Sequence, residues 1–179
     1  MNRHALYFVL AVAAQFLILA AAPAQKIYTR ATGRSVTLKM RPVDPYNVLS
    51  GYYITLNYEI ANPGSFANST DAYIYGHVPF GERVYAILER RADGVWRPVS
   101  LSKSYPADLP ENRIAIGGRY TYSSIEYGIE EFFIPEDKRS EIEEGLRKYH
   151  DQARVEIKVD SNGDAALARL FIGDHVYDY

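Results

Sequence analysis

The chain contains no cysteine among its 179 residues. Disulfide bonds, thiolate catalysis and cysteine-ligated zinc sites are therefore excluded together. The cellular compartment stays open, because many exported domains also lack cysteine. Basic tracts are missing too, and the formal net charge is only −2. Nucleic acid is therefore not expected as a partner.

A complete catalytic set and a metal-binding motif are also missing. The G-x-S-x-G nucleophile sequence does not occur, and the four histidines are not spaced as metal ligands. Residues 160–164 resemble the start of a calcium loop, but the positions that an EF-hand reserves for glycine and a bidentate acid hold Ala165 and Phe171. Asn162-Gly163 is instead typical of a hairpin turn. We expect no catalytic set, no metal ion and no cofactor.

A long apolar segment is present near the N-terminus, from Ala5 to Ala24, interrupted only by Gln15. About 20 apolar residues cross a bilayer core, so residues 5–24 are expected to lie in the lipid bilayer. With Ala22-Pro23-Ala24 at its end, the segment also has the form of a secretory signal. We expect residues 1–25 to be a membrane anchor, or a signal segment cleaved after Ala24, and residues 26–34 to be a polar linker.

The region from Val36 to Ile60 alternates between apolar and polar residues on both sides of a turn. Pro42 and Pro45 mark the turn, because proline lacks a backbone donor and is excluded from central strands. A period of two predicts strands with one buried face. In the second strand this face consists of Tyr52, Ile54, Leu56, Tyr58 and Ile60.

The rest of the chain predicts a β-rich domain with one helix. Further strands are expected at residues 83–91, 95–101, 113–122, 125–134, 154–159 and 165–172. Asp93-Gly94 joins the first two as a hairpin, and Gly117-Gly118 indicates a bulge or bend. The predicted fold class is α+β, predominantly antiparallel β with about seven to nine strands in a barrel- or sandwich-like arrangement. An amphipathic helix near residues 136–150 and a hydrophobic N-terminal helix complete it, and residues 35–179 form a single domain.

Two segments resemble the GDYXXLXY family of membrane-anchored bacterial proteins. The first is PVDP at residues 42–45, followed by GYYITLNY at 51–58. The second is YGIE at 127–130, with FF at 132–133 and PE at 135–136. Tyr52 stands where the family has aspartate. The matching residues are Pro42, Asp44, Pro45, Gly51, Tyr53, Leu56, Tyr58, Tyr127, Gly128, Glu130, Phe133, Pro135 and Glu136.

The resemblance implies a location and a kind of partner, because the family has no established reaction. It implies a single-pass anchor in the bacterial cytoplasmic membrane, an extracytoplasmic domain, and a multi-pass membrane protein as partner. Our leading hypothesis is therefore a non-enzymatic interaction or accessory module of a membrane protein assembly.

Two alternatives remain open. One is an envelope hydrolase that uses Asp44, Glu126 or Glu130. Glu126 and Glu130 are expected on one strand face, where burial can separate the pKa values of two acids. The other is a secreted or periplasmic ligand-binding protein, released by cleavage after Ala24, whose tyrosine-rich face binds the ligand. The candidate functional acids are Asp44, Glu59, Glu126, Glu130 and Glu136.

Overall fold

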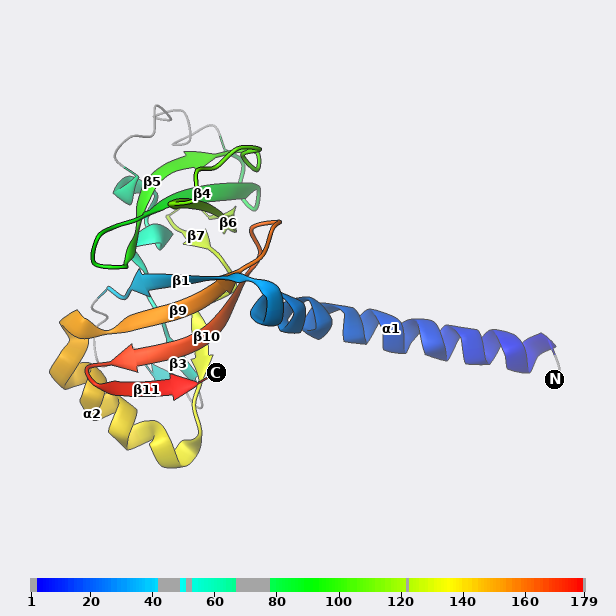
Figure 1. Cartoon of the computed structure of the whole chain (residues 1–179). Helices are drawn as coiled ribbons and strands as arrows, with labels where there is room; N and C mark the ends of the chain where they lie inside the picture. The colour runs from blue at the N-terminus through cyan, green and yellow to red at the C-terminus, as the bar shows by residue number, and fades with distance from the viewer. Residues whose placement is uncertain (1–2, 42–48, 51–52, 67–77, 122, 179) are drawn as a thin grey trace.

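The computed structural model describes residues 3–41, 49–50, 53–66, 78–121 and 123–178. These residues form three antiparallel sheets and two α-helices (Figure 1). The helices are α1 (Arg3–Thr32) and α2 (Arg139–Tyr149). The first sheet has the order β1 (Arg34–Lys39), β9 (Arg154–Val159), β10 (Ala165–Ile172) and β11 (His175–Asp178). The second has the order β2 (Leu49–Ser50), β3 (Tyr53–Thr55) and β8 (Glu131–Phe133). The third has the order β5 (Trp96–Ser102), β4 (Arg83–Arg90), β6 (Arg113–Tyr120) and β7 (Ile125–Glu126).

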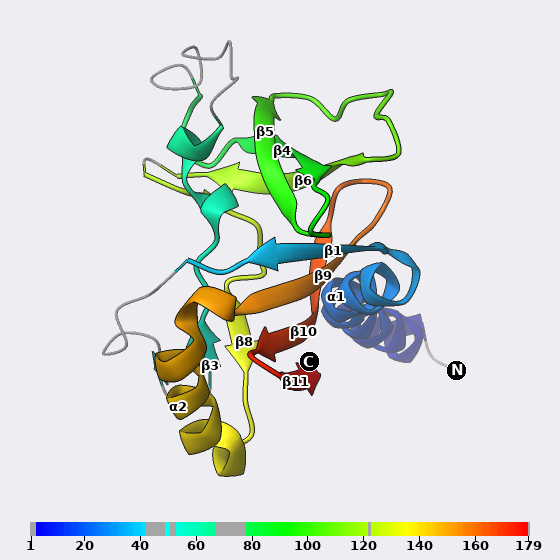
Figure 2. The same ribbon diagram turned by 60° about the vertical axis from the view of Figure 1, so that its left-hand side comes forward.

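All three sheets bury side chains in one hydrophobic core. Val36 of β1, Ile54 of β3 and Ile116 of β6 are each fully buried in it. Helix α2 packs on the first sheet through Ile142, with Leu146 and Tyr149 partly buried beside it, as its period predicted. Figures 1 and 2 show α1 and α2 at opposite ends of this sheet.

The α+β class, the helix near residues 136–150 and the hairpins at Asp93-Gly94 and Asn162-Gly163 are confirmed. The described strands number eleven, above the expected count, because several are only two or three residues long. They do not close into a barrel within the described part of the chain. The predicted bulge at Gly117-Gly118 is wrong, since both residues pair in register with β4. A Cβ on Gly118 would lie 2.5 Å from Ile125 Cγ2, so this glycine permits close packing instead.

Two expected strands are shorter than their alternation suggests. The hydrogen-bonded strand at Tyr53 ends at Thr55, although burial continues to alternate through Leu56, Tyr58 and Ile60. This strand pairs with β8 and not with β1, which pairs with β9. The single strand expected at 125–134 is divided at Gly128, whose φ of +70° is left-handed. Such a backbone cannot continue a ladder, so β7 and β8 join different sheets.

Helix α1 projects away from the domain (Figure 1). It contains Pro23 and bends at this proline, between Leu6–Ala21 and Pro23–Thr32. Proline lacks the N–H for one helical hydrogen bond and clashes with the preceding turn, which explains the bend. No single helix in the described residues is long and apolar enough to cross a membrane. The two parts of α1, Leu6–Ala21 and Pro23–Thr32, lie at 40° to each other, and together they have the length and composition of a membrane span. In place of the linker expected at 26–34, α1 continues to Thr32.

Candidate functional site

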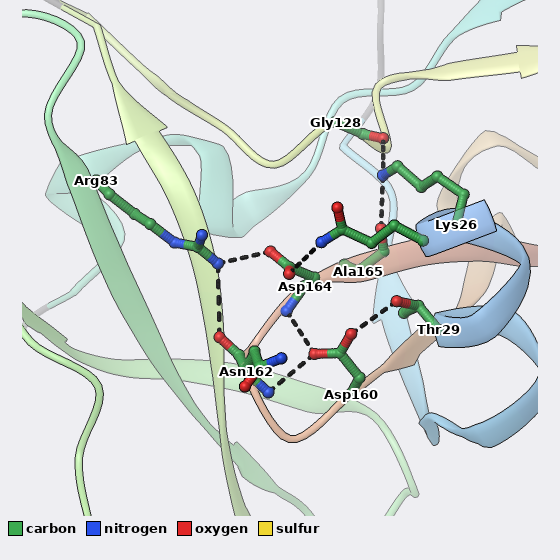
Figure 3. Close-up of polar contacts among 9 residues, drawn as sticks. Lys26, Thr29, Arg83, Gly128, Asp160, Asn162, Asp164 and Ala165 are labelled. Carbon is green, nitrogen blue, oxygen red and sulfur yellow. Dashed lines mark hydrogen bonds and ion pairs between the residues drawn. The ribbon is translucent and has the colours of Figure 1, made fainter. Parts of the chain in front are cut away.

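The last two turns of α1 are held on the domain by three polar side chains (Figure 3). Lys26 Nζ donates hydrogen bonds to Gly128 O at 3.0 Å and to Ala165 O at 2.7 Å. Gln25 Nε2 donates to Asp164 Oδ2 at 2.6 Å, and Thr29 Oγ1 donates to Asp160 Oδ2 at 2.7 Å. We call these contacts, together with the approach of Gly33 to Val159, the helix–domain joint.

The turn between β9 and β10 is shaped to receive the helix. Asp160 Oδ1 accepts hydrogen bonds from the backbone N–H groups of Asn162 and Asp164, at 2.9 and 3.0 Å, while Oδ2 binds Thr29. Arg83 Nη2 contacts Asp164 Oδ1 at 2.6 Å, which ties the third sheet to the same turn. The acidic residues that resemble a calcium loop therefore organise a hairpin and the joint.

Lys26 is partly withdrawn from water at the joint. Burial lowers the pKa of its ammonium group below the ordinary lysine value, and the charges of Glu130 and Asp164 oppose this shift. The two carbonyl oxygens replace part of the hydration that the ammonium group loses. Lys26 thus serves as a structural cation between the helix and the YGIE segment.

Glu130 is a structural acceptor at the turn after β7. Its carboxylate accepts from the backbone N–H of Tyr127 at 2.5 Å and from that of Ile129 at 3.0 Å. The Tyr58 hydroxyl donates to Ile129 O at 2.7 Å, and the Tyr127 hydroxyl donates to Ile60 O at 2.8 Å. These bonds join the two motif segments of the chain, and Lys26 connects them to α1 through Gly128 O.

The other candidate acids do not join this network in the described structure. Glu59 is half-buried in a 3-10 turn (Glu59–Ala61) that packs against β7, where Glu126 is exposed. Glu136 is exposed at the start of a 3-10 turn (Glu136–Lys138) for which Pro135 is the N-cap. The expectation that Glu126 and Glu130 share a strand face is wrong, because the left-handed Gly128 separates them. Asp44 lies outside the described residues.

The remaining motif residues either have structural roles or lie outside the residues that the structure describes. Leu56 is fully buried, and the rings of Tyr53 and Phe133 lie 6.0 Å apart across the β3–β8 pair. Pro42, Pro45, Gly51 and Tyr52 fall on residues that the structure does not describe. Within the described residues, no group of three or more histidine, aspartate or glutamate side chains is placed to hold a metal ion.

An S-x-x-K sequence, Ser100-Leu101-Ser102-Lys103, occurs at the end of β5. The S-x-x-K motif of serine acyl-enzymes brings its serine and lysine together. In a helix, residues three apart share a face. Ser100 here lies in β5, which ends at Ser102, and Lys103 follows in a bend, so no helix brings the two side chains onto one face.

A groove of about 550 Å³ lies beside the joint. The end of α1, the loop after β5 and the β9–β10 turn form its walls, which include Tyr28, Thr32, Tyr105, Pro106, Arg113 and Ser161. Its volume falls in the range of small-ligand pockets. The ligand-binding alternative relied on a tyrosine-rich face, and two tyrosines, Tyr28 and Tyr105, line this groove.

Alkaline titration tests the tyrosine network. Burial raises the pKa of Tyr58 and Tyr127 well above 10.0, and the charge of Glu130 adds to both shifts. Above pH 10 the unfolded chain releases these two protons while the folded chain keeps them, so the free energy of unfolding falls as the pH rises. We expect tyrosinate absorbance to show both residues ionising only on unfolding, and Tyr58→Phe to remove one of the late protons. Ionisation of all tyrosines in one step near pH 10 would contradict the network.

A protein-family model described as "GDYXXLXY protein" matches residues 15–170. The matched range contains both motif segments, the joint and the second half of the apolar segment. Neither the curated proteins nor the solved structures contain a match to the chain.

Proposed function

Because the chain belongs to the GDYXXLXY family, we propose that it is a single-pass protein of the bacterial cytoplasmic membrane. Its extracytoplasmic domain acts as a non-enzymatic module beside other membrane proteins. The observation that carries this proposal is the contrast within α1, which is apolar and exposed along one part and fixed to the domain along the other.

The exposed part of α1 supports membrane insertion. Large apolar side chains project from all sides of the helix, with Phe16 68%, Leu17 72% and Ile18 74% exposed. Apolar surface costs about 25 cal/mol for each Å² left in water, and a bilayer removes that cost. Tyr28 and Arg30 follow at the place expected for residues at the membrane interface.

The docked part of α1 supports an interaction role. A flexible linker would let the domain take any orientation relative to the bilayer. Here the helix continues directly into the joint, where Lys26 and Thr29 hold it on the β9–β10 turn and the YGIE segment. A domain held in one orientation presents the same face to its neighbours in the membrane, which a module of an assembly requires.

The joint also favours an uncleaved anchor. Residues 22–24 are helical, and Gln25 and Lys26 are bound to the domain immediately after them. Cleavage after Ala24 would require this part of the helix to unwind and leave its contacts. The hydrolase alternative receives less support, since the carboxylate of Glu130 is occupied by two backbone donors.

Fractionation of the full-length protein tests the proposal. We expect the chain to remain in the membrane pellet after alkaline washing, with residues 1–24 intact by mass spectrometry. Leu17→Arg places a charge near the centre of the apolar segment, at a cost of roughly 3 kcal/mol, and should reduce retention several-fold. Tyr28→Arg, beyond the apolar segment, is the matched control and should be retained. A soluble chain that begins at Gln25 would overturn the proposal.

A further inference from the structure

Gln15 is the one residue that interrupts the apolar segment from Ala5 to Ala24, and it lies at the middle. Its side chain is exposed on α1 and has no hydrogen-bond partner among the residues that the structure describes. At 1.5 Å per residue, Gln15 is about 15 Å from either end of the segment. A glutamine side chain is too short to bring its amide to the interface from that depth.

An unpaired amide is unfavourable in the bilayer core. Water is absent there, and each unsatisfied donor or acceptor raises the free energy of the inserted state. Within membranes, glutamine side chains obtain partners by hydrogen bonding across helix–helix contacts, where small residues permit close approach. Ala11 precedes Gln15 by one turn on the same side of the helix, which provides such a residue.

Counted through the bend at Pro23, the helical phase of Gln15 matches that of the two residues of α1 that contact the domain. At 100° per residue, Gln15 and Lys26 are only about 20° apart around the helix axis, and Thr29 is about 40° away. Lys26 and Thr29 both contact the domain, so the domain extends outside the membrane on the Gln15 side.

On the premise that the proposed function is correct and α1 spans the bilayer, we propose that the Gln15 face of α1 binds a transmembrane helix of another membrane protein. The partner helix supplies an uncharged polar side chain or a free carbonyl to the Gln15 amide. A second copy of this chain fits less well, because pairing through Gln15 would direct both domains into the space above the paired helices. A membrane-embedded partner with short loops leaves that space to the domain.

Photo-crosslinking in intact membranes tests the face and the role of Gln15. A benzophenone amino acid replaces Ala11 or Ile18 on the proposed face, or Ala13 or Leu17 on the opposite face, in the full-length chain. We expect an adduct from the first two positions at least fivefold stronger than from the other two. Gln15→Leu should lower the Ile18 adduct at least fivefold. The matched control combines Gln15→Leu with Leu17→Gln, which keeps the amino-acid composition but moves the amide to the opposite face of the helix. This double variant should not restore the Ile18 adduct.

The outcomes are separable. Crosslinking that is absent, equal on both faces, or unchanged by Gln15→Leu overturns the proposed helix contact. An adduct of twice the 20.3-kDa chain mass shows self-association and also overturns it. An adduct supports the inference only when it depends on both the face and Gln15. Alkaline washing of the same membranes tests insertion separately, so a chain that is released contradicts the proposed function instead.

Discussion

Replacement of Glu130 by alanine is expected to lower the free energy of unfolding by about 3 kcal/mol, since it leaves the backbone N–H groups of Tyr127 and Ile129 without acceptors. Bonds from backbone donors to a carboxylate are stronger than neutral ones, and both donors lie in a turn that no strand satisfies. The same turn receives the Tyr58 hydroxyl at Ile129 O. Urea unfolding of the full-length protein in detergent, followed through the buried Trp96, measures the change.

Glu126→Ala is the matched control for this prediction. Glu126 is an exposed acid four residues earlier, at the other side of Gly128, and its removal should change the free energy of unfolding by less than about 0.5 kcal/mol. Glu130→Gln keeps one acceptor oxygen and should lie between the two. If Glu130→Ala unfolds at the wild-type urea concentration, the carboxylate is not structural, and a catalytic role would regain support.

Much of the fold follows from periodicity because local patterns determine it. Asp93-Gly94 and Asn162-Gly163 specify turns from a few adjacent residues, and the stripe of Ile142, Leu146 and Tyr149 specifies a helix face. Periodicity also predicts burial beyond the strands themselves. Ile125, Tyr127 and Ile129 are all buried at a spacing of two, yet the ladder is interrupted at Gly128. Alternation therefore reports which side chains face the core, and backbone pairing needs the dihedral angles as well.

The site was less accessible from sequence because its contacts are remote. Lys26 and Ala165 are 139 residues apart in the chain, and Thr29 and Asp160 are 131 apart. No local period connects such pairs, and Lys26 and Thr29 stand in a range that composition alone assigns to a polar linker. The one usable signal was the helical continuity of the chain past Ala24, since residues 25–32 contain no glycine and no proline.

The largest effect on the joint is expected from Gly33→Val. A Cβ at this position would lie 2.5 Å from Thr29 O, 2.9 Å from Val159 N and 3.0 Å from Val159 C. All three atoms belong to the backbone, so no side-chain movement can make room. Arg34 pairs with Val159 in the first sheet, which prevents the chain from shifting away on that side. The end of α1 must therefore leave the β9–β10 turn, and the contacts of Lys26 and Thr29 are lost with it.

We expect hydrogen exchange of the backbone amides at residues 27–32 to become about 100-fold faster in Gly33→Val, which corresponds to about 2.7 kcal/mol of lost local stability. Ala31→Val is the matched control, since it places the same side chain at an exposed position of the same turn. Unchanged exchange in Gly33→Val would show that the joint does not hold the helix. If the domain must be oriented by α1 to act beside a membrane partner, Gly33→Val should also weaken the Gln15-dependent crosslink while the chain stays in the membrane. This result would distinguish a loss of domain orientation from a loss of membrane anchoring, because the wild-type chain and Gly33→Val have the same apolar segment.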